Sequence, residues 1–589
     1  MQFATLGRFF EELEATSGRK ALVAILARLF TEAGPTLVRP VAYLCQGRLA
    51  PFFVPLEIGL GERLVAESIA QAYGVDRAEV LRRYSVAGDL GLVAQALAGE
   101  APQGLDGEPL TVRDVFDRLT EVAKTTGAGS VERKLAIFAS LLARCDPISA
   151  KHVTRIPMGK LRLGIGDPTM LDAFSLAIAG DTSLRKRLER AYNETSDLGL
   201  IAETLWNGGV EAIDQLGIRV GNPIRPALAE RLPSAEAIVG RLGLAAVEPK
   251  LDGFRCQFHK RGDVVSVFSR NLEDMTPMFP ELVEATRAYV LAREAIFEGE
   301  AVAYNAESEE YLPFQETTKR RRKHDVAEWV ESLPLRLFAF DLLYADGENW
   351  CPRPYTERRA ELQRRIAPND TVLTTPVLMT SDADELHSYL LDCIQKGLEG
   401  VVCKKPDSPY QAGARNFNWV KLKRAQARHL QDTVDCVILG YIHGRGKRAA
   451  FGVGALLVGV YDADRDEFQS ITKIGTGLTD EEWREIRARC DALTVDHRPA
   501  RVASNLTPSV WVEPKVVIEV LADEITRSPI HTAGAVNGEP GYALRFPRLV
   551  SFRSDDRRAE DATTVAEIIE MYNQQSALRS RQAEEETDA

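Results

Sequence analysis

The segment from Glu248 to Arg255 reads EPKLDGFR and places one lysine, Lys250, among carboxylates at the end of a predicted strand. Lysine is a nucleophile only in its unprotonated form, and neighbouring cations together with partial desolvation lower the pKa of such an amine. Lys421 and Lys423 supply candidate cations, because alternate positions of a strand project from one face. The segment predicts a covalent role for Lys250, although the same letters taken alone are more typical of a charged β-turn.

Four further short motifs follow this lysine along the chain. They are Ser269-Arg270-Asn271, Phe297-Glu298-Gly299-Glu300, Phe338-Ala339-Phe340-Asp341 and Glu399-Gly400-Val401-Val402-Cys403-Lys404. Each has an ordinary structural explanation on its own: an arginine at a strand end, carboxylates on a solvated rim, a core phenylalanine, or a turn between a helix and a strand. Their joint occurrence in this order, before the lysine pair, is not readily ascribed to chance and favours a shared function.

The set resembles the covalent nucleotidyltransferases, namely DNA ligases, RNA ligases and mRNA capping enzymes, whose hallmark is K-x-D-G followed by E-G-E, E-G-V and K-x-K. From residue 1 to about residue 570 the chain is similar to ATP-dependent DNA ligases of the archaeal type. The further segments that carry this resemblance are Tyr43 to Leu49, Gly127 to Ser130, Leu161 to Gly166, Gly444 to Arg448, Lys473 to Gly477 and Leu544 to Arg548.

The resemblance implies a reaction that begins at Lys250. The lysine attacks the α-phosphorus of ATP, displaces pyrophosphate and carries AMP as a phosphoramidate. The AMP then passes to the 5′-phosphate at a nick in double-stranded DNA, and the 3′-hydroxyl displaces it to seal the strand. Glu248 is expected to read the adenine edge and Phe340 to stack on its face.

The resemblance also assigns the groups that neutralise charge. Contacts on the ribose or phosphate side are expected from Arg255, Arg270 and Glu300. Triphosphate contacts are expected from Arg415, Lys421 and Lys423. Glu399, together with Glu300, is the expected carboxylate for Mg²⁺.

One segment departs from the family pattern. Members tend to close this region with R-x-D-K, whereas the chain reads RSDDR from Arg553 to Arg557, with Asp556 in the usual place of the lysine. Arg557 or Arg558 could substitute after a small shift, so the role of this segment in orienting pyrophosphate stays open.

Periodicity predicts the elements that must position these groups. Phe3, Leu6, Phe10 and Leu13 recur at helical spacing, and amphipathic stretches continue towards Tyr192, so residues 1–210 are predicted to form an all-α domain. The resemblance implies that this domain binds DNA. Glycines and prolines from Gly208 to Pro226 predict a linker.

Alternation of period two begins near residue 245. It predicts a hairpin from Phe254 to Ser269 and strands at Ala295–Tyr304 and Leu335–Tyr344, with a helix at Asp382–Gln395, and therefore an α+β domain over 211–427. The resemblance implies that this domain is the nucleotidyltransferase (adenylation) domain. Short strand-like runs predict a C-terminal β-barrel OB-fold over 428–570. They are Val434 to Tyr441, Ala455 to Tyr461, Glu467 to Ile474 and Val516 to Val520, with a helical insert near Glu481 to Ala492. Residues 571–589 are expected to be an acidic tail.

Composition limits where nucleic acid can bind. The chain has 589 residues and a formal net charge of -12, so a site for a polyanion must be local. Two candidates are predicted. One is Lys319 to Lys323, equally explained as a solvated helix face. The other is Gly127 to Ser130 with Arg133 and Lys134, where amides at a helix start favour phosphate, so contact with the DNA backbone is preferred to the alternative of a merely capped helix.

The cysteines and the apolar stretches indicate the cellular compartment. The eight cysteines contain no C-x-x-C pair, which favours reduced thiols in a cytoplasm. The longest apolar stretch is expected around Gly452 to Tyr461, which is too short to cross a bilayer, so neither export nor a membrane anchor is expected. We expect a monomer; its clamp or repair partners are not specified by the sequence.

The same motifs bear on several other functions. A P-loop ATPase is excluded because Gly444 to Arg448 lacks the glycine spacing and the Ser/Thr. An NAD-dependent ligase would bring a four-cysteine zinc module, although the sequence does not say whether NAD or another nucleotide can replace ATP. An RNA ligase or capping enzyme stays possible, but the long helical domain argues against both. A non-catalytic nucleic-acid binder is disfavoured because the lysines and carboxylates are all retained.

Overall fold

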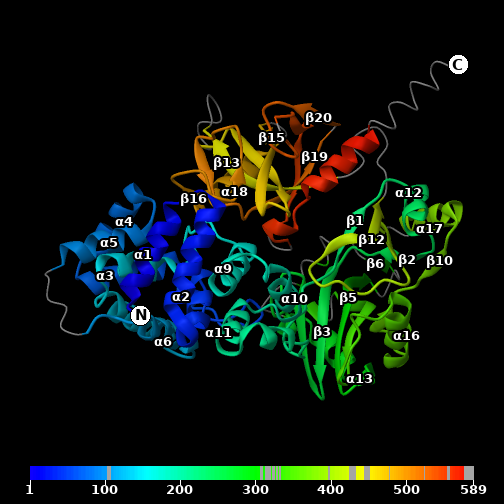
Figure 1. The fold of residues 1–589 in the computed structure, drawn as a ribbon, viewed down its shortest axis with the longest axis horizontal. Coiled ribbons are helices and arrows are strands. Elements are labelled where there is room, and N and C mark those ends of the chain that lie inside the picture. Colours follow the sequence, from blue (N-terminus) through cyan, green and yellow to red (C-terminus); the bar gives the residue numbers. More distant parts are fainter. Residues whose placement is uncertain are drawn as a thin grey trace. The chain divides into compact units, whose positions relative to one another are not determined.

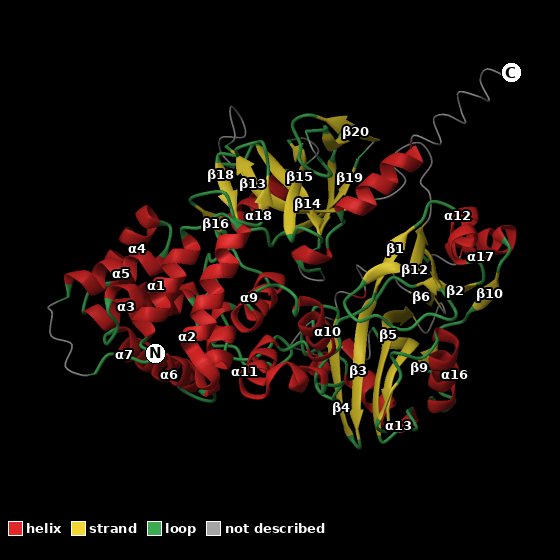
Figure 2. Cartoon of the chain, viewed as in Figure 1, coloured by secondary structure: helices red, strands yellow, loops and turns green. Residues whose placement is uncertain are grey.

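The computed structural model describes residues 1–101, 108–305, 310–311, 317, 320, 326, 329–330, 333–395, 398–423, 433–443, 452–475, 478–522, 524–536, 538–553 and 557–575. The chain divides into two compact units. The first comprises Met1–Tyr192, Asp197–Gly217 and Val495–Arg501, and the second comprises Asn193–Ser196, Ile218–Thr494 and Val502–Ala589. Helices dominate the first unit and strands the second (Figures 1 and 2).

The first unit is built from helices that share one apolar core. They are α1 (Phe3–Glu14), α2 (Arg19–Cys45), α3 (Glu62–Tyr73), α4 (Arg77–Ala87), α5 (Leu90–Glu100), α6 (Val112–Lys124), α7 (Ser130–Leu142), α8 (Pro147–Arg155), α9 (Asp167–Ala179), α10 (Arg185–Thr195) and α11 (Leu198–Asp214). Phe3, Leu6, Phe10 and Leu13 are all fully buried on one face of α1. The predicted all-α N-terminal region is confirmed.

Helix α2 corrects one expectation. By length and composition it could cross a membrane, so Gly452–Tyr461 is not the longest apolar stretch. However, Gly34 leaves helical geometry at φ 63° within α2, and Leu26, Leu29 and Phe30 are completely buried in the helical core. A core helix of a soluble protein has the same composition, because both environments exclude water from apolar side chains.

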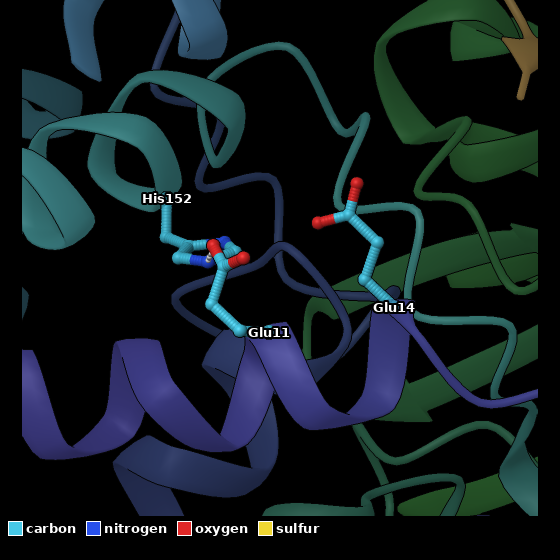
Figure 3. A group of neighbouring side chains, drawn as sticks. All are labelled: Glu11, Glu14 and His152. Atoms are coloured by element: carbon cyan, nitrogen blue, oxygen red, sulfur yellow. Dashed lines mark hydrogen bonds and ion pairs between the residues drawn. The ribbon is translucent and has the colours of Figure 1, made fainter. Parts of the chain in front are cut away.

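A buried charge cluster joins α1 to α8. Glu11 accepts from Lys151 at 2.8 Å and lies 2.8 Å from Nε2 of His152, while Glu14 pairs with Arg155 at 2.9 Å. Figure 3 shows the Glu11 carboxylate against the His152 ring, with Glu14 further along the same helix. Lys151 and Arg155 already neutralise these carboxylates, so the cluster is explained as an ion-pair network that fastens the two helices.

The second unit contains two sheets before residue 424. One has the order β1-β12-β11-β2-β10, and the other β4-β3-β5-β7-β8 with β6 and β9 attached. Their strands are β1 (Leu228–Arg231), β2 (Ala245–Lys250), β3 (Phe254–Arg261), β4 (Val264–Ser269), β5 (Glu294–Asn305), β6 (Glu310–Tyr311), β7 (Leu335–Ala345), β8 (Glu348–Asn349), β9 (Val372–Thr374), β10 (Leu378–Thr380), β11 (Gly400–Lys404) and β12 (Arg415–Lys423). The predicted hairpin and both long strands are therefore confirmed.

Helices accompany these two sheets. They are α12 (Ala235–Leu242), the 3-10 turn η1 (Thr276–Met278), α13 (Pro280–Tyr289), α16 (Tyr355–Arg365) and α17 (Ala383–Gln395). Leu386, Leu390 and Cys393 of α17 are buried in one cluster with Val247 of β2 and Val401 of β11. The helix predicted at Asp382–Gln395 is confirmed, and its apolar face supports the sheet that carries Lys250.

The remainder of the second unit is rich in strands. They are β13 (Val434–Ile442), β14 (Ala455–Asp462), β15 (Glu467–Ile474), β16 (Thr494–Val495), β17 (Val502–Ala503), β18 (Val510–Val512), β19 (Val517–Leu521), β20 (Glu524–Ser528), β21 (Gly541–Arg545) and β22 (Arg548–Phe552), with α18 (Asp480–Asp491) and η4 (Ala559–Asp561). Residues 565–575 are helical. Strand β13 pairs with β14, β18 and β19, and β19 continues to β22. The strand-rich C-terminal fold is confirmed, as is the predicted helix within it.

Candidate active site

One cavity of about 220 Å³ in the second unit collects every side chain predicted for the site. These residues are Glu248, Lys250, Arg255, Arg270, Glu300, Phe340, Glu399, Arg415, Lys421 and Lys423. They come from both sheets before residue 424, and Asp435, Glu519, Arg553, Arg557, Asp561 and Glu567 add side chains from the strand-rich region. Residues far apart in the sequence therefore line the same cavity.

Strand register explains how the lysines meet. In the antiparallel pairs of β11, Gly400 lies opposite both Lys250 and Lys423, and Val402 lies opposite both Glu248 and Lys421. Side chains directly opposite one another, or two positions along, project from the same face of a sheet. The predicted alternation of Lys421 and Lys423 is confirmed, and it places both lysines on the face of the sheet that carries Lys250.

Gly400 allows the sheet to turn close to Lys250. Its φ is +147°, and a Cβ atom there would lie 2.1 Å from the carbonyl oxygen of Leu422. Only glycine fits this position without moving the backbone. The preceding residue, Glu399, is therefore brought to Lys250, whose main-chain oxygen accepts from the Glu399 amide at 3.2 Å.

Glu399 lies between two lysines. Its carboxylate forms an ion pair with Lys250 and lies 3.8 Å from Nζ of Lys423. Burial alone would raise the pKa of Glu399, but the charges of Lys250 and Lys423 outweigh it and hold the pKa well below its usual value. Glu399 is therefore an ionised group at neutral pH.

The pKa of Glu300 is shifted in the opposite direction to that of Glu399. Burial raises its pKa to about 7, Lys250 and Arg255 oppose the rise, and the nearby carboxylates Glu399 and Asp252 add to it. Its Oε1 accepts from the amide of Gly253 at 3.2 Å. Glu300 and Glu399 thus form a pair of hard oxygen donors whose mutual repulsion a divalent cation would relieve.

Glu248 is held from several sides although it lines the cavity. Lys404 lies 2.8 Å from its Oε2, Arg359 donates to its Oε1 at 3.4 Å, and the Tyr355 hydroxyl also donates to Oε1. Only 3% of Glu248 is exposed. A buried carboxylate needs such donors, because an unpaired charge away from water is costly.

Phe340 presents an aromatic ring to the cavity. The Phe340 ring lies edge-on to Trp419, with 6.0 Å between the two ring centroids. Nζ of Lys404 lies 4.6 Å from the centroid of the Phe340 ring. The Arg255 guanidinium is 5.4 Å from the same ring, and it is held by Glu298 at 2.8 Å. Trp419 and Arg255 also line the cavity, so the ring sits among fixed neighbours.

The cations of β12 already have an anionic partner. Glu567, from the helical residues 565–575, pairs with Arg415 and lies 3.6 Å from Nζ of Lys421. Burial lowers the pKa of Lys421 to about 7, an effect that Glu567 opposes. For Glu567 itself, burial would raise the pKa, but Arg415 and Lys421 lower it to about 2. Glu567 therefore supplies the negative charge that these cations require.

Arg270 is the cation at another wall of the cavity. Its Nε lies 3.9 Å from Asp561 of η4. Burial lowers the pKa of Arg270 to about 10, and Asp561 opposes that change. The guanidinium therefore remains protonated at neutral pH. Arg553 and Arg557 also line the cavity, the latter paired with Asp435, whereas residues 554–556 of the atypical segment lie outside the described residues.

The two basic segments proposed for DNA differ in the structure. Arg320 is buried and pairs with Glu281, so its prediction as a solvated or DNA-contacting side chain was wrong; the rest of Lys319–Lys323 lies outside the described residues. At the start of α7, Arg133 donates to the carbonyl of Ala128 at 2.8 Å, and Lys134 donates to that of Ile58 at 3.0 Å. Both side chains have protein acceptors, so contact with phosphate stays a prediction.

Sequence reasoning missed Tyr355, Arg359 and Glu567, and it assigned no role to Lys404, although this lysine closes the motif that begins at Glu399. The alternation of a strand puts Lys404 on the same face as Val402, which lies opposite Glu248. Tyr355 and Arg359 carry only the weak signal of helical spacing, and Glu567 follows no site motif. Seven of the eight cysteines are buried, and all eight are free.

Comparison with known proteins identifies the family. The description "ATP dependent DNA ligase domain" matches residues 226–423, "DNA ligase N terminus" matches 2–175, and "ATP dependent DNA ligase C terminal region" matches 449–556. A probable DNA ligase of Dictyoglomus thermophilum is 49% identical, with 100% of each chain covered. A DNA ligase of Sulfurisphaera tokodaii is 40% identical, again with 100% of each chain covered.

A solved structure of mycobacterial DNA ligase D complexed with ATP and MES is 24% identical, with a TM-score of 0.33, and covers 58% of this chain and 97% of that chain. The chain belongs to the ATP-dependent DNA ligase family. Its activity is the ATP-dependent joining of DNA strands through an adenylate. The match of all three regions decides against the RNA ligase, the capping enzyme and the non-catalytic binder.

Proposed function

We propose that Lys250 is the residue that carries AMP during ligation. Its amine would form a bond to the α-phosphorus of ATP while the bond from that phosphorus to the pyrophosphate oxygen breaks. The AMP would then pass to the 5′-phosphate of nicked duplex DNA, and the 3′-hydroxyl would displace it. The observation that carries this proposal is the position of Lys250 at the end of β2, in one cavity with Glu399, Lys421 and Lys423.

Glu248 and Phe340 are proposed to recognise the base. Aromatic stacking on Phe340 suits any purine, whereas the Glu248 carboxylate accepts a hydrogen bond from an exocyclic amine such as that of adenine. Guanine does not present an amine in the same place. The cavity contains both side chains, and this supports their joint use.

Cations on two walls are proposed to hold the rest of the nucleotide. Arg255 and Arg270, with Glu300, would contact the ribose or phosphate side. Arg415, Lys421 and Lys423 would neutralise the triphosphate and the charge that develops as pyrophosphate leaves. The pairing of Glu567 with Arg415 supports this role, because phosphate oxygens would replace a carboxylate of like charge.

Mg²⁺ is proposed as the cofactor beside ATP. Glu300 and Glu399 fit it, since hard oxygen donors suit this ion and the pKa of Glu300 is raised to about 7 by burial and by neighbouring carboxylates. When bound, Mg²⁺ supplies positive charge that offsets the triphosphate and polarises its oxygens.

The family and the charge pattern support a proposal for the partner and for the cellular location. We propose nicked double-stranded DNA as the substrate, gripped by the helical domain without reading sequence, and a monomer that acts in the cytoplasm in replication, repair and recombination. We also propose a division into 1–210, 211–427, 428–570 and an acidic tail at 571–589. The family regions matched at 2–175, 226–423 and 449–556 support this division.

Lys250→Ala tests the assignment of the nucleophile. The variant should form no covalent adduct with α-labelled ATP and should seal no nick from ATP, because the amine that bonds to phosphorus is gone. Lys405→Ala is the matched control, since this lysine lies outside the cavity and pairs with Asp407. Both proteins are scored for labelling and for strand joining, with circular dichroism as the check on folding. A labelled adduct in Lys250→Ala would assign the reaction to another residue.

A further inference from the structure

The helix α16 supplies two side chains that reach Glu248 from outside the cavity. Tyr355 and Arg359 lie one turn apart, which places them on the same face of the helix. Both meet the same oxygen, Oε1 of Glu248. Tyr355 is completely buried and Arg359 is 7% exposed, and neither lines the cavity. They therefore contact the proposed base reader without contacting the space for the base.

The helix itself is fastened on both sides of this contact. The amide of Tyr355 donates to the carbonyl of Ser408 at 3.0 Å. Arg359 also donates to the carbonyl of Thr375, whose hydroxyl donates to Ala339 at 3.0 Å. Thr375 lines the cavity. These bonds give the donors to Glu248 fixed positions, because each donor is tied to backbone that is itself paired.

The contacts leave Glu248 with limited freedom to accept more hydrogen bonds. An ionised carboxylate offers about four lone-pair sites on its two oxygens. Tyr355 and Arg359 use Oε1, and Lys404 uses part of Oε2. The lone pair of Oε2 that stays available to a ligand therefore points in one direction. A carboxylate held in this way distinguishes a donor from a group that cannot donate, because a mismatch leaves buried polar groups unpaired.

We propose that Tyr355 and Arg359 are positioning residues for base discrimination, acting through Glu248. This inference rests on the proposed role of Glu248 as the reader of the adenine edge. The two residues hold the carboxylate so that it accepts from an amine at purine C6. Tyr355 and Arg359 do not contact the nucleotide. Their loss therefore changes which base is preferred and leaves the rate of the reaction at Lys250 nearly unchanged.

The test compares ATP with purine riboside triphosphate, which lacks only the exocyclic amine. The rate of Lys250 adduct formation divided by KM is measured for both nucleotides. Tyr355→Phe and Arg359→Met should each reduce the preference for ATP by about tenfold, the scale of one hydrogen bond to a charged group. Most of the change should lie in KM for ATP, with the maximal rate nearly unchanged. Arg359→Lys should recover part of the preference.

Arg358→Lys is the matched control. Arg358 is the neighbouring buried arginine of α16, and it pairs with Asp341 at 2.7 Å rather than with Glu248. Damage to the helix or the fold lowers the use of both nucleotides together, so the ratio in this variant should equal that of the natural chain. Lys404 is not used as a probe, because it lines the cavity and could touch the base directly.

Glu248→Met separates this inference from the proposed base contact on which it rests, because methionine has neither a carboxylate nor an amide oxygen to accept from the amine. If Glu248→Met keeps the preference for ATP, Glu248 does not read the amine, and both the proposed base contact and the inference fail. If Glu248→Met loses the preference while Tyr355→Phe and Arg359→Met keep it, the base contact stands and the inference alone is overturned. Parallel loss in all three variants, with Arg358→Lys unchanged, supports it.

Discussion

At the residue scale, neighbouring positions of β2 have different surroundings. Glu248 is held by Lys404 and by two donors from α16. Lys250 instead pairs with Glu399 and, like Lys423, lies opposite Gly400 of β11. Only Pro249 separates Glu248 from Lys250 in sequence, and the alternation of a strand puts both side chains on one face. We infer that a single short strand presents the base reader and the nucleophile to one nucleotide.

Phe340→Ala tests the stacking contact at this scale. Loss of the ring should weaken ATP binding by on the order of 1 to 3 kcal/mol, the magnitude for a base stacked on an aromatic side chain. Calorimetric titration of ATP in the absence of DNA provides the measurement. Phe417→Leu serves as a control, because Phe417 lies on β12 but does not line the cavity. Equal ATP affinity in the natural chain and Phe340→Ala would refute the placement of the base.

At the scale of elements, β3 fixes the chain segment that precedes the nucleotide site. Gln257 exchanges two hydrogen bonds with the backbone of Ile224, at 2.7 and 3.0 Å. Nδ1 of His259 accepts from the amide of Gly221 at 2.9 Å. Glycine and proline predict a linker here, but these bonds give it a defined path along the sheet.

His259 makes this attachment dependent on pH. Burial lowers the pKa of His259 from 6.5 to about 3, and the charge of Arg261 adds to the effect. The unfolded chain therefore takes up a proton before the folded one, so the stabilisation is complete above pH 6.5 and is lost as the pH falls towards about 3. At about pH 5 the expected loss is about 2 kcal/mol.

His259→Gln is the variant that checks this. Its midpoint of thermal unfolding should start lower near neutral pH but should fall less on acidification than that of the natural chain. Differential scanning calorimetry between about pH 7.5 and about pH 5 covers the window in which the unfolded histidine titrates. Identical pH slopes for the two proteins would show that His259 titrates normally when folded.

The helical residues 565–575 act on the proposed phosphate site. Glu567→Gln should lower KM for ATP by about fivefold, because the nucleotide no longer competes with a carboxylate for Arg415 and Lys421. The assay follows adduct formation without DNA at mildly acidic pH, which keeps Lys421 cationic when its partner is removed. Glu570→Gln on the same segment is the control. An unchanged or higher KM in Glu567→Gln would mean that Glu567 does not occupy a phosphate position.

At the scale of the whole molecule, charge opposes the proposed substrate. The net charge is -12, yet the ligase must bind a polyanion, so the favourable contacts have to be local. Arg133 and Lys134 at the start of α7 stay candidates, together with the glycines that precede them. Such contacts act through backbone phosphates and release counterions.

Duplex affinity should therefore depend steeply on salt. Between about 50 and about 200 mM salt, the affinity for a nicked duplex should fall by about a hundredfold or more. Fluorescence anisotropy of a labelled duplex measures it, with Lys250→Ala used to prevent turnover. A second duplex of different sequence should give the same slope, since phosphate contacts carry no sequence information. A flat response would remove the electrostatic account.

Local rules were sufficient for much of the fold and the site. Alternation predicted β3, β4, β5 and β7, because the period of a strand is set by the backbone alone. The helical face of α1 followed in the same way from Phe3, Leu6 and Phe10. The resemblance added the identity of the site residues, and every one of them lines the cavity.

Other features depend on which distant segments meet, and no local pattern contains that information. Arg320 was expected on a surface but is buried against Glu281. Composition alone predicted neither the core position of the long apolar helix α2 nor its break at Gly34. The sequence by itself determined which residues could do the chemistry, through their types and their spacing. Only the tertiary structure decided that Tyr355 and Arg359 hold Glu248 and that Glu567 meets Arg415, because packing between elements selects those partners.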